Sequence, residues 1–372
     1  MAGGSGVVPD SATCNNRIHE QLYMSKYNIL SHYFILPVLL LLLTSVVACE
    51  KDEGDDEVIP VDTSSYPATG FKTLDYLYRI SGTRTLSGIH NREPNSKPAQ
   101  WTDQIYTTTQ KYPALWSGDF LFQAENIDNR QVMVDEALKQ WKRGAVVNLM
   151  WHACNPALSE PCEWNQDGVL SQMTDTQWNE LLTDGTAINS KWKAMMDDVA
   201  VYLQFLEDNG VEVLWRPLHE MNQRAFWWGG RPGANGTRKL YQLTHDYFKN
   251  AKGLTNLIWV WDLQDFESLP DDVTRYNPGD AYWDVLALDL YDGGSGYSTL
   301  KYTTIVQAAN GKPIGIGECQ DLPTIAELIA QRRWTFFMSW SELTFESNTD
   351  QEIKTLYNGA YILTLDEMPG WE

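Results

Sequence analysis

The chain has 372 residues, 43% of them hydrophobic, which is enough for a large packed core in one or two domains. Its formal net charge of −21 argues against nucleic acid or an anionic membrane surface as a partner, because either would repel it. The 16 Trp and 18 Tyr exceed the number that a core of this size normally holds, and flat rings of this kind stack on the apolar faces of sugars. The composition therefore favours a neutral ligand, while about half of the rings are expected to belong to the core.

The N-terminal part of the chain indicates export. Residues 34–48 form an apolar run that is too short for a typical membrane-spanning helix and reads as a signal peptide. The run ends in Val-Val-Ala-Cys, which resembles the lipobox of bacterial lipoproteins, so we expect Cys49 to be lipidated. The leader with its signal peptide covers residues 1–48 of the printed sequence. Residues 1–23 carry acidic side chains, unlike a targeting segment, so we expect Met24 to be the true start. The alternative is an ordinary secretory signal with an incidental cysteine.

An acidic segment, residues 49–65, follows the leader and predicts a solvated tether. Residues 50–57 hold six acidic side chains and one lysine, and no apolar side chain that could join a core. The Lys-Asp-Glu run after Cys49 resembles the surface-export signal of Bacteroidetes lipoproteins. This resemblance implies an outer-membrane lipoprotein at the cell surface that contacts the membrane only through its lipid. The alternative is an acidic tether with no sorting role.

From residue 66 to residue 372, short β-branched and aromatic runs alternate with longer helical patterns, which is typical of repeated βα units and a parallel sheet. Eight runs are nearly continuously apolar, as buried parallel strands should be: residues 86–90, 114–120, 145–152, 211–220, 257–262, 285–291, 313–319 and 336–342. Helical periodicity lies between them at residues 131–143, 191–208, 238–251, 299–309, 325–333 and 351–357. The sequence predicts an α/β fold of the (β/α)8 TIM-barrel type, with one catalytic domain.

The ends of the predicted strands carry the chemistry. Active sites of such barrels lie at the C-terminal ends of the strands, in the loops that lead to the helices. Titratable and aromatic side chains crowd at these ends, although a purely structural sheet end does not need them. They are His90, Asp119, His152, His219, Glu220, Asp262, Asp289, Tyr291, Glu318, Trp340 and Glu342.

Two of these side chains form a candidate catalytic pair. Glu220 ends the fourth predicted strand and Glu318 the seventh, and these strands face each other across the barrel. A retaining glycosidase needs two carboxyl groups about 5–5.5 Å apart, one protonated and one ionised. The pair therefore predicts glycoside hydrolysis with retention, while a structural salt bridge at either position is the alternative.

Two segments resemble glycoside hydrolase family 26, whose best-known members are endo-β-1,4-mannanases. Residues 215–222, Trp-Arg-Pro-Leu-His-Glu-Met-Asn, followed by Phe-Trp-Trp-Gly at 226–229, resemble its acid/base motif, and Lys-Pro-Ile-Gly-Ile-Gly-Glu-Cys at 312–319 resembles its nucleophile strand. The resemblance implies that Glu220 is the acid/base, Glu318 the nucleophile and His219 an orienting neighbour. It also implies that His152, Tyr291 and Trp340 surround the sugar at the point of cleavage.

The resemblance implies cleavage of β-1,4-mannosidic bonds in mannan, glucomannan or galactomannan. Two alternatives remain open: the same mechanism on mixed-linkage β-glucan or β-1,3-xylan, and a surface lipoprotein that binds glycans without cleaving them. No cofactor is expected, and the protein is expected to be a monomer.

The residues themselves suggest further roles. Arg216 is a fixed cation that could keep Glu318 ionised, although it could instead only bridge strands. Asn222 could fix the acid/base region, and the substrate could also contact two adjacent tryptophans, Trp227 and Trp228, which could equally lie in the core.

The remaining cysteines predict a loop feature. Cys154 and Cys162 lie eight residues apart in one predicted loop of an exported domain, where a disulfide and two free thiols are equally plausible. Two cysteines without a second ligand pair do not make a tetrahedral zinc site, so no metal is expected.

Overall fold

The computed structural model of the protein describes residues 68–291 and 296–371. The predicted leader, the start at Met24, the lipidated Cys49 and the acidic tether lie outside the described residues. None of the helices within the described ranges has both the length and the apolar character needed to cross a bilayer.

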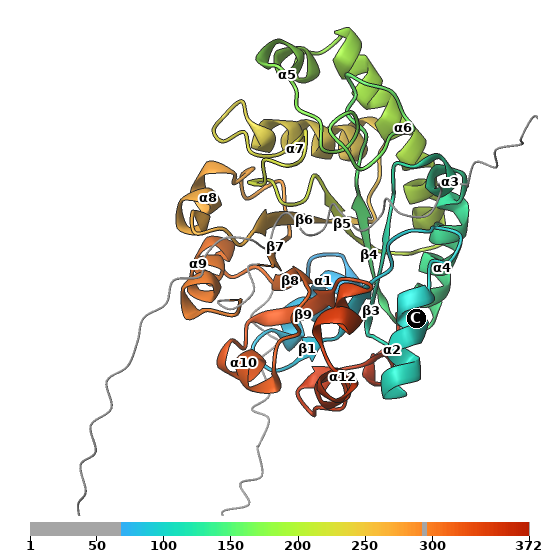
Figure 1. The fold of residues 1–372 in the computed structure, drawn as a ribbon, viewed down its shortest axis with the longest axis vertical. Helices are drawn as coiled ribbons and strands as arrows, with labels where there is room; N and C mark the ends of the chain where they lie inside the picture. The colour runs from blue at the N-terminus through green and yellow to red at the C-terminus, as the bar shows by residue number, and fades with distance from the viewer. Residues whose placement is uncertain (1–67, 292–295, 372) are drawn as a thin grey trace, which may run out of the picture. The chain divides into compact units, whose positions relative to one another are not determined.

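Eight parallel strands close into a barrel, which confirms the predicted fold (Figure 1). Each strand pairs with the next, and the last strand pairs with both the strand before it and the first, which closes the sheet. The barrel strands are β2 (Gly88–His90), β3 (Leu115–Asp119), β4 (Val146–Trp151), β5 (Val213–Pro217), β6 (Leu257–Gln264), β7 (Val285–Leu290), β8 (Ile314–Cys319) and β9 (Trp334–Ser339).

Two short strands extend the sheet at one position. The strand β1 (Thr85–Leu86) pairs in parallel with β9 and with β10 (Ile362–Leu363). The segment just before the first barrel strand and the C-terminal segment of the chain therefore meet beside β9. Every residue of the ten strands is buried, which explains why their sequences are apolar without alternation.

Helices surround the barrel (Figure 1). Three of them, α5, α10 and α12, begin at a threonine whose hydroxyl accepts from the backbone N–H three residues later, where a Gln or Glu side chain bonds back. The described helices are α1 (Lys72–Ile80), α2 (Gln100–Thr109), α3 (Ala124–Asp128), α4 (Arg130–Lys142), α5 (Asp175–Leu182), α6 (Ala187–Asp208), α7 (Thr237–Asp246), α8 (Leu269–Arg275), α9 (Thr299–Ala309), α10 (Ile325–Ala330), α11 (Leu343–Ser347) and α12 (Asp350–Tyr357).

Several predicted element bounds were wrong. The fourth strand was predicted to reach residue 220 but ends at Pro217, because Leu218 and Glu220 adopt φ angles of 54° and 46°, which no strand accommodates. The helix predicted over 238–251 changes to a π-helical turn at Tyr247–Ala251, and the one predicted over 325–333 ends at Ala330. The helices α1, α2, α3, α5, α8 and α11 were not predicted, since most are short.

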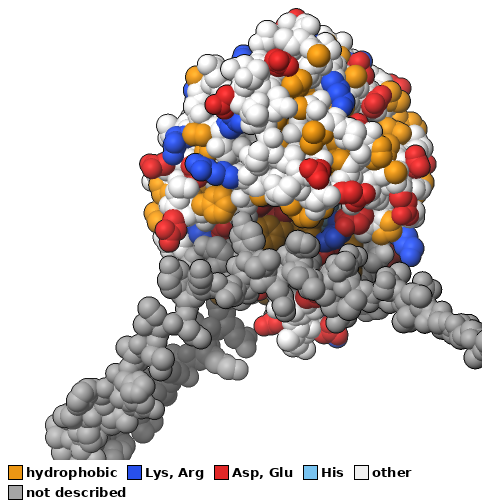
Figure 2. Space-filling view, turned by 45° about the horizontal axis from the view of Figure 1, so that its top comes forward, with side chains coloured by type: hydrophobic (Ala, Val, Ile, Leu, Met, Phe, Trp, Pro, Cys, Tyr) orange, Lys and Arg blue, Asp and Glu red, His pale blue; other side chains and the backbone are white. Residues whose placement is uncertain are grey.

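Much of the aromatic surplus belongs to the core. Nine of the 16 tryptophans expose less than 2% of their surface. Their rings fill the space between the barrel and its helices, as in the stack of Trp151 on Trp192, whose centroids lie 4.8 Å apart. Trp164, by contrast, is 51% exposed and is available to a ligand. Figure 2 shows acidic and basic side chains interspersed on the visible face of the described residues.

The barrel interior leaves no room for a side chain at Gly315 of β8. An added Cβ there would lie 2.1 Å from the Phe336 ring of β9, so Gly315→Ala must displace that ring. We expect a loss of about 1–3 kcal/mol in the free energy of unfolding, measured by urea denaturation. Gly296→Ala is the control, because an added Cβ there meets none of the described residues within 4 Å. Equal stabilities of the two variants would contradict this packing.

Candidate active site

The predicted site residues gather at the C-terminal ends of the barrel strands. Arg216 lies within β5 and Glu318 within β8, so the strands themselves fix their positions. His152, Tyr291 and Trp340 are the first residues after β4, β7 and β9. The site therefore stands on the rigid barrel, as the strand-end pattern predicted.

Glu220 reaches the site through a tight turn after β5. The positive φ angles of Leu218 and Glu220 are unfavourable for residues with a side chain, so the turn needs support from its surroundings. The support comes from Asp262 of β6, whose Oδ1 accepts a hydrogen bond of 2.8 Å from the Glu220 backbone N–H. The Glu220 side chain is 6% exposed and faces the strand ends.

Arg216 is shared by three buried carboxylates from the three following strands. Its Nε donates to Asp262 Oδ2 at 3.0 Å, and its Nη2 donates to Asp289 Oδ2 at 2.5 Å and to Glu318 Oε1 at 2.6 Å. Burial opposes the positive charge, but the three carboxylates raise the Arg216 pKa well above its usual value. The guanidinium is therefore a permanent cation that ties β5 to β6, β7 and β8.

Gly317 makes this cluster possible. A Cβ at that position would lie 2.5 Å from Asp289 Oδ1 and 2.6 Å from Asp262 Oδ2, so any side chain would push two partners of Arg216 aside. The register between β7 and β8 also shifts there, since Leu288 pairs with Ile316 but Asp289 pairs with Glu318. Gly317 and Glu318 consequently both face the barrel interior, and the bulge turns Glu318 toward Arg216.

Glu318 is held by two donors. Arg216 binds its Oε1, and the Tyr291 hydroxyl donates to its Oε2 at 2.7 Å. Burial raises the pKa of Glu318 above its usual value, and Arg216 and the Tyr291 hydrogen bond offset part of this rise. Burial and Glu318 raise the pKa of Tyr291 well above its usual value, so the phenol keeps its proton and donates. Both oxygens of Glu318 are thus bonded to groups that favour the carboxylate.

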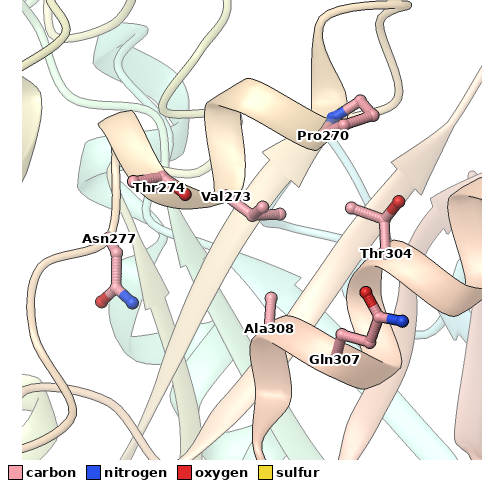
Figure 3. A pocket seen from close by; sticks show the side chains of 7 residues that line it. All are labelled: Pro270, Val273, Thr274, Asn277, Thr304, Gln307 and Ala308. Carbon is pink, nitrogen blue, oxygen red and sulfur yellow. The ribbon is translucent and has the colours of Figure 1, made fainter.

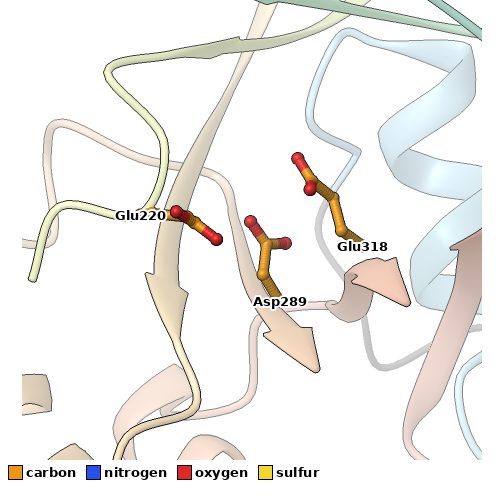
Figure 4. A group of neighbouring side chains, drawn as sticks. All are labelled: Glu220, Asp289 and Glu318. Atoms are coloured by element: carbon orange, nitrogen blue, oxygen red, sulfur yellow. The ribbon is translucent and has the colours of Figure 1, made fainter. Parts of the chain in front are cut away.

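Glu220 has a pKa that is raised well above its usual value. Burial, and then the charges of Glu318 and Asp262, raise it, and the charge of Arg216 opposes them. One ligand oxygen each of Glu220, Asp289 and Glu318 lies within 4.8 Å of the other two, and Figure 4 shows the three carboxyl groups gathered in one space. Such a group could hold a cation, but here Arg216 already bonds two of its members.

Three histidines line the same space. Asp119 binds both the ring Nδ1 of His152, at 2.5 Å, and its backbone N–H, at 3.1 Å, which fixes that ring. The rings of His152 and His219 lie 4.4 Å apart, and burial, followed by the charge of His152, lowers the pKa of His219 well below its usual value. His90 stacks on Trp340 at 4.3 Å, and burial lowers its pKa to about 3. His90 and His219 are therefore neutral at pH 7.

The remaining predicted residues lie behind this space. Trp228 is fully buried, stacks on Phe226 and donates to the His219 carbonyl at 2.9 Å, so it supports the turn before Glu220. Trp227 donates to the Ala153 carbonyl and packs against Trp192, away from the carboxylates. The structure therefore brings together the predicted carboxylates, Arg216, the histidines, Tyr291 and Trp340, and leaves Trp227 in the core.

Two residues near the site were missed by the sequence analysis. Gln264, the last residue of β6, donates from Nε2 to Glu220 Oε1 at 2.9 Å, and Asn222 bonds the backbone of Gln264. The position of Gln264 near a strand end was the signal that could have found it, but the Gln264 side chain carries no charge. Trp164 lies with its ring 5.5 Å from that of His152, in T-shaped contact.

A disulfide joins Cys154 and Cys162, the two cysteines that precede Trp164 in the loop after β4. The loop is also held by the Cys162 backbone N–H, which donates to the Phe122 carbonyl, and by the Phe122 ring, which lies 6.1 Å from the Trp164 ring. The exposed face of Trp164 is therefore presented from a restrained loop beside the histidines.

A groove of about 440 Å³ elsewhere in the described chain has no such chemistry. It lies between α8 and α9 (Figure 3), and none of its lining side chains is titratable. They are Pro270, Val273, Thr274, Asn277, Thr304, Gln307 and Ala308.

The arrangement at the strand ends suits one type of reaction. One oxygen of Glu220, whose pKa is raised well above its usual value, lies within 4.8 Å of one oxygen of Glu318, which Arg216 bonds. This short separation agrees with retaining glycoside hydrolysis and is shorter than that of inversion. Sequence comparison agrees: the model of Glycosyl hydrolase family 26 matches residues 63–367. The chain belongs to this family.

Individual family 26 relatives match most of the chain. The mannan endo-1,4-beta-mannosidase of Thermothelomyces thermophilus is 31% identical over 334 residues, which cover 84% of this chain and 64% of that protein. The chain thus spans less than two thirds of that relative, and about half of two further ones.

Among solved structures, GH26A from Muricauda sp. is similar with a TM-score of 0.74 and 34% identity, over 79% of this chain and 95% of that one. A beta-mannanase from a symbiotic protist of the termite Reticulitermes speratus, complexed with gluco-manno-oligosaccharide, has a TM-score of 0.71 and 26% identity, over 82% and 96%.

The raised pKa of Glu220 predicts how stability depends on pH. Because the folded state holds this proton more tightly than the unfolded chain does, its contribution is present below the usual pKa of 4.5 and is lost as pH rises through the folded value. Glu220→Gln has no proton to lose at this position, so the Tm of this variant relative to that of wild type should increase between pH 4 and pH 8. Each kcal/mol of unfolding free energy corresponds to roughly 2–4 °C in Tm. Glu267→Gln in an exposed loop is the control. A Tm difference that does not change with pH would contradict the assignment.

Proposed function

We propose that this protein is a retaining β-mannanase that cleaves β-1,4-mannosidic bonds in mannan, glucomannan or galactomannan. The observation that carries the proposal is the pair Glu220 and Glu318: one oxygen of each lies within 4.8 Å of the other, and Glu318 is the member of the pair whose side chain Arg216 and Tyr291 bond. Glu220 is the acid/base and Glu318 is the nucleophile.

The first step forms a covalent intermediate. A Glu318 oxygen bonds to the anomeric carbon as the bond from that carbon to the leaving oxygen breaks, and the Glu220 proton passes to the leaving oxygen. In the second step, a water molecule gives its proton to Glu220 and its hydroxyl group to the anomeric carbon, which releases Glu318. Glu220 recovers its proton and the configuration is retained.

The neighbours of Glu318 prepare it for this step. Arg216 and Tyr291 each hold one oxygen, and both contacts favour the ionised carboxylate. One side of the same space carries the neutral ring of His219, which can exchange hydrogen bonds with sugar hydroxyl groups without adding charge. Trp340, on His90, and the exposed Trp164 offer flat apolar surfaces for sugar rings.

The substrate class rests on the family relatives. The curated relatives are mannan endo-1,4-beta-mannosidases, and one solved relative is a beta-mannanase holding a gluco-manno-oligosaccharide. A neutral polymer also agrees with a chain of net charge −21.

The catalytic assignment predicts a distinct result for each variant. Glu318→Ala should lose nearly all hydrolysis of mannohexaose and of dinitrophenyl β-mannobioside, because both need the nucleophile. Glu220→Gln should hydrolyse mannohexaose about 10²–10⁴-fold more slowly, because the leaving group of this substrate needs a proton. With the dinitrophenyl substrate, whose leaving group needs no proton, the rate of the first step, in which the sugar bonds to Glu318, should change little. Activity is measured as reducing ends and as released dinitrophenolate.

Controls separate this assignment from its alternatives. Proton NMR of the first product should show the β-anomer, since double displacement retains configuration. Hydrolysis of mixed-linkage β-glucan or β-1,3-xylan in preference to mannans would refute the substrate class, and binding of mannan without any hydrolysis would refute the enzyme. Undiminished hydrolysis by Glu318→Ala would refute the nucleophile.

We also propose that the protein is an outer-membrane lipoprotein, exposed at the cell surface and anchored through Cys49. The support is the apolar run at residues 34–48, which ends in Val-Val-Ala before Cys49, and the acidic run after it. A polymer too large to enter the cell would then meet its enzyme outside.

The anchoring proposal predicts that Cys49→Ala abolishes labelling of the full chain by radioactive palmitate in a Gram-negative host and releases the protein from membranes. Cys14→Ala is the matched control and should leave labelling unchanged. Cleavage by protease added to intact cells tests surface exposure. Unaltered labelling of Cys49→Ala would refute lipidation at this residue.

A further inference from the structure

Gln264 is the one described side chain that hydrogen bonds to the carboxyl group of Glu220. It ends β6, is 7% exposed, and its Nε2 donates to Glu220 Oε1 at 2.9 Å. None of the described residues bonds to Glu220 Oε2, so the two oxygens of this carboxyl group are in different environments.

The orientation of the Gln264 amide is fixed by its other contacts. Its Oε1 accepts from the Asp265 backbone N–H at 2.8 Å, so the NH₂ group must face Glu220. Asn222 then clamps the Gln264 backbone, since its Oδ1 accepts from Gln264 N–H at 2.8 Å and its Nδ2 donates to Gln264 C=O at 2.9 Å. An inverted amide would place its NH₂ group against the Asp265 backbone N–H, so that two donors would face each other.

Buried contacts from two helices hold this segment. Lys301 of α9 donates to Asp265 Oδ2 at 2.7 Å, and the two side chains are 11% and 2% exposed. Asp272 of α8 accepts from Asn222 Nδ2 at 2.9 Å. Gln264 therefore belongs to a rigid network that extends from the helices to Glu220.

We infer that Gln264 is the positioning residue of the acid step: it occupies Oε1 of Glu220 and so assigns the transferable proton to Oε2. The inference rests on the proposed function, in which Glu220 gives that proton to the leaving oxygen. A neutral carboxyl group accepts through the oxygen without the proton, so the Gln264 donor selects the other oxygen as the acid. As the proton leaves, Glu220 becomes a carboxylate and the same hydrogen bond becomes charge-assisted and stronger.

A donor to Oε1 also favours ionisation of Glu220, so its removal should raise the pKa of that group. Other charged and titratable groups surround Glu220 and interact electrostatically with it. The variants used below leave these groups unchanged. They are Arg216 on β5, Asp262 and Asp265 at β6, Asp289 and Tyr291 at β7, and Glu318 on β8.

Gln264→Met tests the inference because it keeps the length of the side chain and removes the donor. We expect kcat/KM on mannopentaose to fall about 10–100-fold, the usual effect of a misplaced catalytic group. On dinitrophenyl β-mannobioside, whose leaving group needs no proton, we expect less than a threefold change. Gln351→Met, on the exposed face of α12, should change neither rate.

The pH profile provides a readout that a purely structural role would not change. Loss of the donor should move the alkaline limb of kcat/KM on mannopentaose to higher pH and leave the acidic limb in place. Gln264→Glu should move the alkaline limb further, because a second carboxyl group beside Glu220 disfavours its ionisation. Equal losses on both substrates, or an unmoved alkaline limb, would overturn the inference.

A direct titration distinguishes this inference from the proposed function. In protein labelled with ¹³C-glutamate, the Glu220 carboxyl resonance, assigned by its absence in Glu220→Gln, should titrate at higher pH in Gln264→Met than in wild type. An unchanged midpoint overturns the inference even in an active enzyme. Failure of wild type to cleave any mannan substrate overturns the proposed function, whatever the titration shows.

Discussion

One buried guanidinium organises the C-terminal end of this barrel. Arg216 bonds Asp262, Asp289 and Glu318, so a single cation connects four adjacent strands. Without it, three carboxyl groups would lie close together in a medium that strongly disfavours their charge. Asp262 in turn bonds the Glu220 backbone N–H, so the guanidinium also fixes the proposed acid/base. The distance between the carboxyl groups of Glu220 and Glu318 therefore depends on one side chain that bonds only Glu318.

This arrangement requires backbone geometry that is not intrinsically favourable. Glu220 has a φ of 46°, and the close approach of Gly317 to two carboxylates excludes any side chain there. Strain of this kind persists where the surroundings determine the conformation from several sides, as Asp262 and Trp228 do around the turn before Glu220. The rigid strands thus hold the site in place before any sugar binds.

The sequence predicted the barrel because parallel strands buried on both faces are continuously apolar, and it predicted the carboxylate pair because strand order determines which ends meet. The turn at Leu218 and Glu220 was not predictable, since neither residue type favours a positive φ. Gln264 was missed because its importance comes from a hydrogen bond between the end of β6 and the turn after β5, which no local pattern records. The exposure of Trp164 depends on its restrained loop, whose conformation the spacing of two cysteines does not define.

The division of roles between Glu220 and Glu318 has the same origin. Both are glutamates and burial raises the pKa of both, so residue type and burial alone would make them equivalent. The difference arises at the bulge in β8, where the shift in register at Gly317 turns Glu318 inward to Arg216 and Tyr291. In a regular strand, successive side chains would alternate, and Glu318 would face the helices while Gly317 faces Arg216. The bulge thus gives Glu318 two donors that stabilise its charge, whereas the pKa of Glu220 is raised well above its usual value.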